Sequence, residues 1–227
     1  VHGLGEHSGR YTNVTNYFVP RGYAVYSFDN IGHGKSGNGR EEIDRFEDLT
    51  APVTTITAMI REWYPDLPVF IYGHSMGALI TSFHLLDRQE DYKGAIISAP
   101  LVTIPSHVSP MTVRLGKILS VIAPKMELVD VDPSSLSRDK SVVEAYVNDP
   151  LVFHKKALAR ISAEMLRAIY ANLNPAAPPQ LQTSPPPMAS EAGESIYSIN
   201  LIRSLNFARI QVKRFGAEIV ADIRQVV

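Results

Sequence analysis

Residues 68–85 read PVFIYGHSMGALITSFHL, and this stretch decides the fold class. The first part, PVFIY, is a continuous apolar run, which is typical of a strand buried on both faces of a parallel sheet. The last part, ALITSFHL, has helix length and follows Gly-x-Ser-x-Gly, with Ser75 at its centre. That pattern between a strand and a helix predicts a sharp turn that projects a serine hydroxyl above the sheet edge. The alternative is an ordinary glycine-flanked turn with a capping serine.

The rest of the first hundred residues alternates in the same way. Short β-rich runs at 23–29, 67–72 and 94–98 predict strands, and helix-length segments lie between them. The predicted helices are 10–19, 45–63 and 75–88. We therefore expect an α/β domain with a mostly parallel sheet, of which residues 1–100 form the N-terminal part of the core.

Residues 101–170 differ in pattern, because they predict helices without strands, at 110–122, 141–146 and 155–169. The first of these helices is rich in apolar residues, so it either packs on the core or faces lipid. Six of the 16 prolines fall between 175 and 187, which predicts a Pro-rich linker over 171–195. Residues 196–227 are expected to be a tail of unknown role, with a helix over 208–226.

Composition excludes several classes of protein. The chain has 227 residues, 45% of them apolar, and a formal net charge of −1, so it carries no basic footprint for nucleic acid. Cysteine is absent, which excludes disulfides, thiolate zinc sites and cysteine nucleophiles. No apolar run approaches the roughly 20 residues of a membrane span. No signal peptide is visible, but the chain starts without methionine, so a missing N-terminus could hide one. We therefore expect the chain to be a piece of a longer protein.

A second segment, HGLGEH at 2–7, can complete a site around Ser75. The N–H of Met76 lies at a helix N-terminus, where an oxyanion would develop. A His-Gly turn followed by a helix can aim a second backbone N–H at the same oxygen, and Leu4 is the expected donor. Alternatively, the segment is a Gly-rich loop between a strand and a helix.

Three motifs in this order, HGLGEHSGRY, FDNIGHGKSG and LPVFIYGHSMGALI, resemble the monoglyceride lipases of the α/β-hydrolase superfamily. The resemblance continues through SAPLV and PSSLSRDKSVVEAYVNDPLVFHKK, so it covers about residues 1–170. It implies a serine hydrolase that cleaves monoacylglycerols to fatty acid and glycerol, without a metal or cofactor. The expected fold is a truncated α/β-hydrolase fold with a helical lid insertion and a C-terminal tail foreign to the family.

The resemblance also implies roles for particular residues. Ser75 would be the nucleophile, and the amides of Leu4 and Met76 would form the oxyanion hole. Glu6 and Arg10 match the polar end of the pocket, near the glycerol head. Residues 101–170 would be the lid, whose apolar helix then favours peripheral membrane contact in a cytoplasmic protein that binds no nucleic acid.

The segment FDNIGHGKSG invites two other interpretations. Asp29 and His33 could be triad partners, and residues 34–36, Gly-Lys-Ser, could belong to a phosphate loop. The phosphate loop also needs a glycine where Asp29 stands. We prefer a structural loop that packs near the nucleophile turn, which is its role in the family that it resembles.

The base and the acid of a triad are the missing parts. In α/β-hydrolases the acid and then the histidine follow the serine in the chain, yet none of the seven histidines lies beyond His154. Residues 171–227 contain neither pattern, so we expect both groups to be absent and the chain to be inactive. The alternatives are a non-catalytic isoform that binds lipid or a partner, and a mispredicted sequence after about residue 170.

Overall fold

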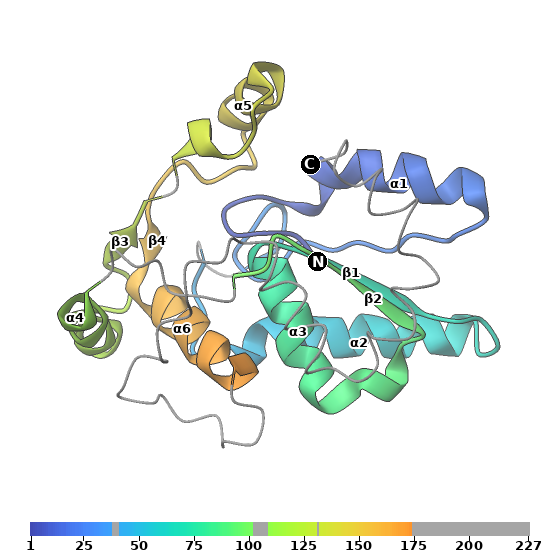
Figure 1. Ribbon diagram of the computed structural model, residues 1–227, viewed down its shortest axis with the longest axis horizontal. Coiled ribbons are helices and arrows are strands. Elements are labelled where there is room, and N and C mark those ends of the chain that lie inside the picture. The colour runs from blue at the N-terminus through green and yellow to red at the C-terminus, as the bar shows by residue number, and fades with distance from the viewer. Residues whose placement is uncertain (38–40, 102–108, 131, 174–227) are drawn as a thin grey trace.

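The computed structural model describes residues 1–37, 41–101, 109–130 and 132–173 (Figure 1). Strands β1 (Phe70–His74) and β2 (Gly94–Ser98) pair in parallel, with Phe70 opposite Gly94 and His74 opposite Ser98. The strand predicted at 94–98 is confirmed. Strand β1 begins three residues later and ends two residues later than the predicted 67–72. The α/β class that the sequence predicted is confirmed.

Helices lie on both sides of these strands. In Figure 1, α1 (Thr12–Phe18) lies above them, and α2 (Glu47–Trp63) and α3 (Met76–Arg88) lie below. Short 3-10 turns, η1 (Ser8–Tyr11), η2 (Val19–Arg21) and η3 (Gln89–Asp91), extend the helices. The three helices predicted in this part therefore form, with small shifts at their ends.

The strand predicted at 23–29 is wrong. No strand is found at these residues, which form no ladder with another strand in the described part of the chain. A β-strand is defined by its hydrogen-bonded neighbour, which an apolar run alone cannot supply. Aromatic contacts hold the stretch instead, since Tyr23 packs on Phe18 and Phe70 while Tyr26 packs on Trp63.

The expectation of helices without strands over 101–170 is also wrong. Strands β3 (Glu127–Val129) and β4 (Ala157–Leu158) form a small antiparallel sheet. Two or three residues are too few to show a period in the sequence, and the pairing joins positions about 30 residues apart. The same region contains α4 (Pro110–Ile122), η4 (Pro133–Ser135), α5 (Lys140–Val147) and α6 (Ala159–Leu173).

Local sequence sets where two of these helices begin. The hydroxyl of Ser109 accepts the N–H of Thr112 at 3.1 Å, and Pro110 occupies the first turn of α4. At α5, the carboxylate of Asp139 accepts the N–H of Ser141 at 2.9 Å. Both are N-caps that satisfy backbone donors left free at a helix start.

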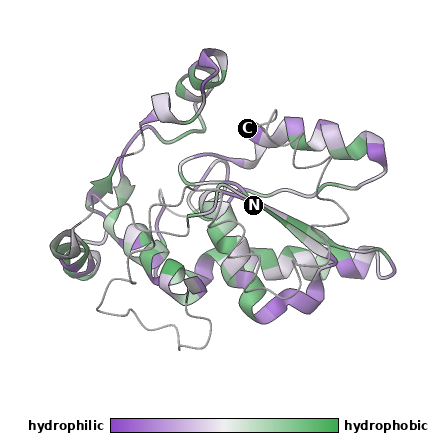
Figure 2. Cartoon of the chain, in the orientation of Figure 1, coloured by the Kyte–Doolittle hydropathy of each residue, from purple (hydrophilic) through white to green (hydrophobic). Residues whose placement is uncertain are grey.

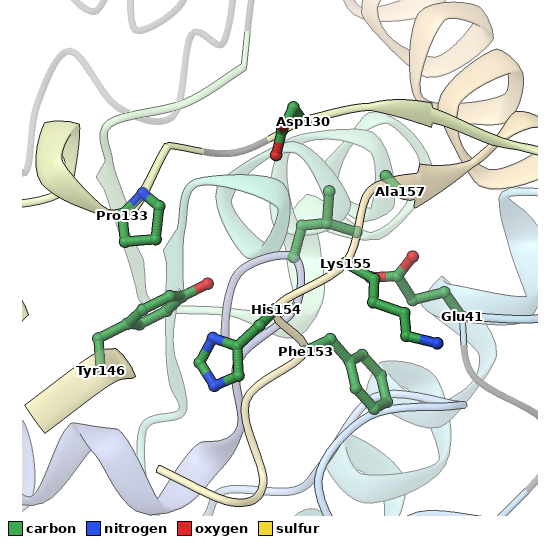
Figure 3. A pocket seen from close by; sticks show the side chains of 10 residues that line it. Glu41, Asp130, Pro133, Tyr146, Phe153, His154, Lys155 and Ala157 are labelled. Atoms are coloured by element: carbon green, nitrogen blue, oxygen red, sulfur yellow. The ribbon is translucent and has the colours of Figure 1, made fainter. Parts of the chain in front are cut away.

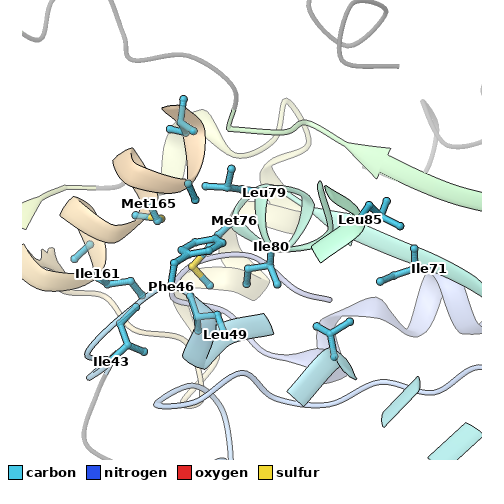
Figure 4. Packing of buried hydrophobic residues seen from close by; sticks show 14 of the residues in the cluster. Ile43, Phe46, Leu49, Ile71, Met76, Leu79, Ile80, Leu85, Ile161 and Met165 are labelled. Carbon is cyan, nitrogen blue, oxygen red and sulfur yellow. The ribbon is translucent and has the colours of Figure 1, made fainter. Parts of the chain in front are cut away.

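The hydrophobic core joins α6 to the α/β part of the chain (Figure 4). Phe46, Leu79 and Ile161 are fully buried, and Ile161 and Met165 of α6 pack in the same cluster as Met76 and Leu79. Burial of each such side chain contributes about 1.5–3 kcal/mol. The last helix of the predicted lid region is therefore built into the core.

Ion pairs reinforce the position of α6. The guanidinium of Arg167 lies 2.9 Å from Glu164 and 2.5 Å from Glu47 of α2. Glu164 also accepts the backbone N–H of Phe46 at 3.0 Å. Helix α6 continues to Leu173, past the predicted start of the linker at 171, and the rest of that linker and the tail at 196–227 lie outside the described residues. The domain boundaries stay predictions.

Across the described ranges, none of the helices combines the length and the apolar character that crossing a bilayer requires.

Candidate active site

Ser75 lies on the sharp turn between β1 and α3. Its backbone has φ 54° and ψ −120°, a strained conformation for a residue with a side chain. The Ser75 N–H donates to the carbonyl of Ser98 at 3.0 Å, and its own carbonyl accepts the N–H groups of Ala78 and Leu79. The strained turn is thus held by β2 on one side and by the first turn of α3 on the other.

The two glycines of the motif permit close backbone approach. A methyl group on Gly77 would contact the carbonyls of Val1 and His2, and one on Gly73 would contact the carbonyl of Gly77 and Thr81. The N-terminal segment therefore crosses directly over the start of α3. The capping-serine alternative is not the arrangement found, since the Ser75 side chain makes no cap hydrogen bond.

The segment at 2–7 passes beside the serine. A methyl group on Gly3 would lie 3.2 Å from Cβ of Ser75. Leu4 follows Gly3, and Met76 is the first residue of α3, so its N–H precedes the helical hydrogen-bond ladder. The structure thus brings together the three segments that carry Ser75, Leu4 and Met76, whose roles as nucleophile and oxyanion donors stay predictions.

Glu6 ties this loop together. One carboxylate oxygen accepts the N–H of Gly3 at 2.7 Å and the hydroxyl of Tyr11 at 2.5 Å, and the other lies 3.4 Å from Nε of Arg10. Burial, followed by the Glu6 charge, raises the pKa of Tyr11 far above its usual value, so the hydroxyl stays a donor. Glu6 therefore holds the loop in shape. These contacts do not test the role of Glu6 and Arg10 at a glycerol head, which stays a prediction.

A pocket of about 90 Å³ opens beside the loop (Figure 3). Leu4 and Gly5 form one wall, and Glu41, Tyr146, Phe153 and His154 contribute others. Glu41 is only 2% exposed, and its carboxylate lies 4.0 Å from Nε2 of His33. Neither Glu41 nor Tyr146 could be named as a pocket residue from the sequence, because no short motif marks either of them for that role.

The loop FDNIGHGKSG is held by its own polar contacts. Asp29 accepts the N–H and the hydroxyl of Ser8 at 2.8 and 2.7 Å and the N–H of Lys35 at 2.8 Å. Burial raises the pKa of the Asp29 carboxyl, but the bonds from Lys35 and Ser8 outweigh it and leave the pKa below its usual value. Nδ1 of His33 pairs with the carbonyl of Ile31 at 2.9 Å. These contacts support the structural interpretation over triad or phosphate-loop roles.

The described histidines have partners other than Ser75. Hydrogen bonds pair His2 with Asn30, His7 with Asp149, His33 with Ile31, His74 with Ser98 and His84 with Tyr92. His154 packs edge-on against Tyr146, and His107 lies outside the described residues. Burial lowers the pKa of His74, the histidine next to the serine in the chain. The absence of a triad base and acid from the chain stays a prediction.

Comparison with known proteins places this geometry in a family. Residues 1–180 match the family model Hydrolase_4, described as serine aminopeptidase S33. The chain is 36% identical over 167 residues to the monoglyceride lipase homolog of Monkeypox virus, covering 74% of this chain and 60% of that protein. It is 34% identical over 166 residues to a monoacylglycerol lipase of Mycolicibacterium smegmatis, covering 73% of this chain and 59% of that protein.

Solved structures agree with these relatives. The crystal structure of the Paleococcus ferrophilus monoacylglycerol lipase superposes with a TM-score of 0.67 at 30% identity, over 75% of this chain and 64% of that one. The chain spans about three fifths of the length of the curated relatives it matches. The resemblance stated from the motifs is confirmed. Since the family model covers most of the sequence, the chain belongs to the family Hydrolase_4, serine aminopeptidase S33, and has an α/β-hydrolase fold.

Proposed function

We propose that this chain derives from a serine hydrolase of the monoacylglycerol lipase type, with Ser75 as the nucleophile. The observation that carries the proposal is the strained Ser75 turn, with the Gly3 segment against its side chain. Strained backbone of this kind is found where a structure holds a reactive group in a fixed orientation. The names of the relatives supply the substrate class, a monoacylglycerol.

The reaction proceeds in two steps. The Ser75 oxygen attacks the ester carbonyl, a bond forms between them, and the bond to the glycerol oxygen breaks with transfer of the serine proton to glycerol. Water then hydrolyses the acyl-enzyme to release the fatty acid. The amides of Leu4 and Met76 stabilise the oxyanion in both steps.

The chain by itself lacks the base and the acid in this proposal. Loss of those groups from a serine hydrolase lowers the rate by about 10⁴- to 10⁶-fold, while substrate binding and oxyanion donors remain. In this proposal the chain therefore has the nucleophile of the family but not the base and the acid that transfer its proton. The polar ends of Glu6 and Arg10 would face the glycerol head.

A fluorophosphonate probe followed by mass spectrometry tests the nucleophile. We expect slow labelling of Ser75 in the purified chain, none in Ser75→Ala, and unchanged labelling in Ser120→Ala, which removes a buried hydroxyl of α4. Labelling at another residue would refute the assignment. Hydrolysis of monoacylglycerol at the rate of an intact lipase, abolished by Ser75→Ala, would show instead that the chain has its own base.

A second candidate function, lipid binding without catalysis, is favoured by the surface of α4. Figure 2 colours much of this helix as hydrophobic. The exposed fractions on it are 70% at Met111, 53% at Leu115, 57% at Ile118, 69% at Val121 and 71% at Ile122. Helix α4 includes Arg114 and Lys117 but no acidic residue. An apolar face bordered by basic side chains suits the interface of an anionic bilayer.

Sedimentation with phosphatidylcholine vesicles, with and without phosphatidylserine, tests this peripheral contact. We expect binding that strengthens with phosphatidylserine and falls at least about tenfold in Leu115→Glu/Ile118→Glu, because each change removes an apolar anchor and adds a repelled charge. Val147→Glu, at a residue of α5 that is 47% exposed, is the matched control. Equal loss in both variants would argue against a contact through α4.

A further inference from the structure

Asp149 lies in the loop after α5, far along the chain from the segment beside Ser75, yet it contacts that segment. Its Oδ2 atom lies 2.9 Å from Nε2 of His7, across 142 sequence positions, and 4.0 Å from Nη1 of Arg10. Its Oδ1 atom accepts the N–H of Leu151 at 2.9 Å. The side chains of His7 and Asp149 are only 11% and 21% exposed, so water screens this pair weakly.

The other nitrogen of His7 fixes which way the proton lies. Nδ1 of His7 accepts the N–H of Gly9 at 3.2 Å and so caps η1. An imidazole nitrogen that accepts carries no proton, so the proton is on Nε2 and is donated to Asp149. A methyl group on Gly9 would lie 3.0 Å from Nδ1, which is why glycine suits this position. A carboxylate that accepts from one ring nitrogen thereby makes the other nitrogen a good acceptor.

A series of contacts connects the cap at His7 to the segment beside Ser75. The turn that His7 caps carries Arg10 and Tyr11, and both of these contact Glu6. Glu6 in turn holds the N–H of Gly3, the residue against Ser75. Each step is a direct contact, so the orientation of His7 fixes the loop that carries Leu4.

Two further contacts join the same segments. The N–H of Phe153 donates to the carbonyl of Gly5 at 2.7 Å, and the guanidinium of Arg10 lies 4.8 Å from the ring centre of Tyr146. The segment 146–153 therefore forms one wall against which residues 5–10 are held, and Asp149 supplies the charged contact in that wall.

We propose that Asp149 is a positioning residue, which acts through His7 to hold residues 3–7 in the shape that presents the Leu4 amide to the oxygen formed at Ser75. The effect of Asp149 on catalysis rests on the proposed function, whereas its effect on the shape of residues 3–7 does not. The bond is charge-assisted and partly buried, which makes it stronger than an ordinary surface contact. No local sequence pattern marks Asp149 for this role.

The competing explanation is that Asp149 only shapes its own turn through Leu151. Asp149→Asn separates the two, because an asparagine oxygen still accepts the Leu151 N–H while the negative charge toward His7 and Arg10 is lost. Asp139→Asn is the matched control. Asp139 also accepts an N–H two residues ahead, from Ser141, and its turn lies at the start of α5.

The test uses the full chain with ¹⁵N-labelled histidine. We expect the NMR spectrum of the unchanged protein to show His7 protonated at Nε2, and Asp149→Asn to give a mixture of tautomers. Hydrogen exchange in residues 3–11 should accelerate about tenfold in Asp149→Asn and stay unchanged in Asp139→Asn. A proton on Nδ1 of His7 in the unchanged protein, or equal exchange in both variants, would overturn the proposal.

Kinetics add a readout that a purely structural turn would not change. Where the chain hydrolyses monoacylglycerol, Asp149→Asn should lower kcat about tenfold with little change in KM, because the oxyanion donors act on the transition state. A raised KM at unchanged kcat would count against positioning. Failure of the fluorophosphonate probe to label Ser75 would refute the proposed function alone, since the NMR and exchange results decide the role of Asp149 independently.

Discussion

The Nε2 atom of His2 accepts the backbone N–H of Asn30 at 2.8 Å, and both residues are buried. The Nδ1 atom of the same ring lies 2.8 Å from the carbonyl of Gly3, so it is the nitrogen that carries the proton. The ring is therefore held in its neutral form between the segment beside Ser75 and the loop at 29–37. Burial, followed by the nearby His33, lowers the pKa of His2 to about 3.

This shift predicts loss of stability in acid. In the unfolded chain His2 takes up a proton near pH 6.5, whereas in the folded chain it stays neutral to about pH 3. The unfolded state thus binds more protons in that window, and the free energy of unfolding falls as the pH falls. We expect His2 alone to account for a loss of about 2 kcal/mol between pH 7 and pH 5.

Urea unfolding of the unchanged chain and of His2→Gln at both pH values measures that contribution. Glutamine has both a donor and an acceptor but does not titrate, so its stability should depend less on pH. His154→Gln, at an exposed histidine, serves as the control and should keep the full dependence. An unchanged pH dependence in His2→Gln would mean that His2 is not the group responsible.

Gly77→Ala should destabilise the fold, because the added methyl group meets the carbonyls of Val1 and His2, which are backbone and move only with the segment beside Ser75. Overpacking of this kind costs about 1–3 kcal/mol. Thermal or urea unfolding measures it. Gly116→Ala is the matched control: nothing lies within 4 Å of its added methyl group, and in helix α4 alanine should add up to about 1 kcal/mol of stability. A neutral Gly77→Ala would contradict the close approach.

Ser75→Gly should make the chain more stable than Ser75→Ala. Both variants remove the hydroxyl, but only glycine relaxes at φ 54°, where a Cβ atom is strained. We expect a difference of about 1 kcal/mol in the free energy of unfolding. Equal stabilities would show that the turn stores no strain.

Ile161→Ala should cost about 2–5 kcal/mol, because the side chain is fully buried where α6 meets α3 and its loss leaves a cavity. Leu115→Ala removes an exposed side chain of α4 and should change stability by less than about 0.5 kcal/mol. Urea unfolding of both variants tests whether α6 belongs to the core of the α/β part. A small effect of Ile161→Ala would indicate that α6 is only loosely attached.

The features that the sequence predicted well are local. The turn at Ser75, the strand at 94–98 and the helix at 110–122 depend on short runs of residues whose backbone preferences and caps act over a few positions. The stretch at 23–29 failed for the opposite reason: its composition favours a strand, but a strand also requires a neighbour to bond with.

The candidate site also combines features set by local sequence with features that depend on contacts between distant segments. Ser75, Leu4 and Met76 could be named from motifs, because the strained turn and the helix start are built from adjacent residues. Asp149 and Glu41 could not, since their charges gain importance only from the groups that the fold brings to them. Asp149 lies in a segment that carries the family resemblance, but nothing in that segment indicates a contact with His7.

The sequence by itself determined the class of the fold and the position of the sharp turn at Ser75, because a glycine-flanked turn between an apolar strand and a helix is decided within about twenty residues of chain. The tertiary structure alone decided what holds that site in shape. His7 and Asp149 meet across 142 positions, and only the packing of the segment 146–153 against residues 5–10 brings a carboxylate within hydrogen-bonding distance of an imidazole.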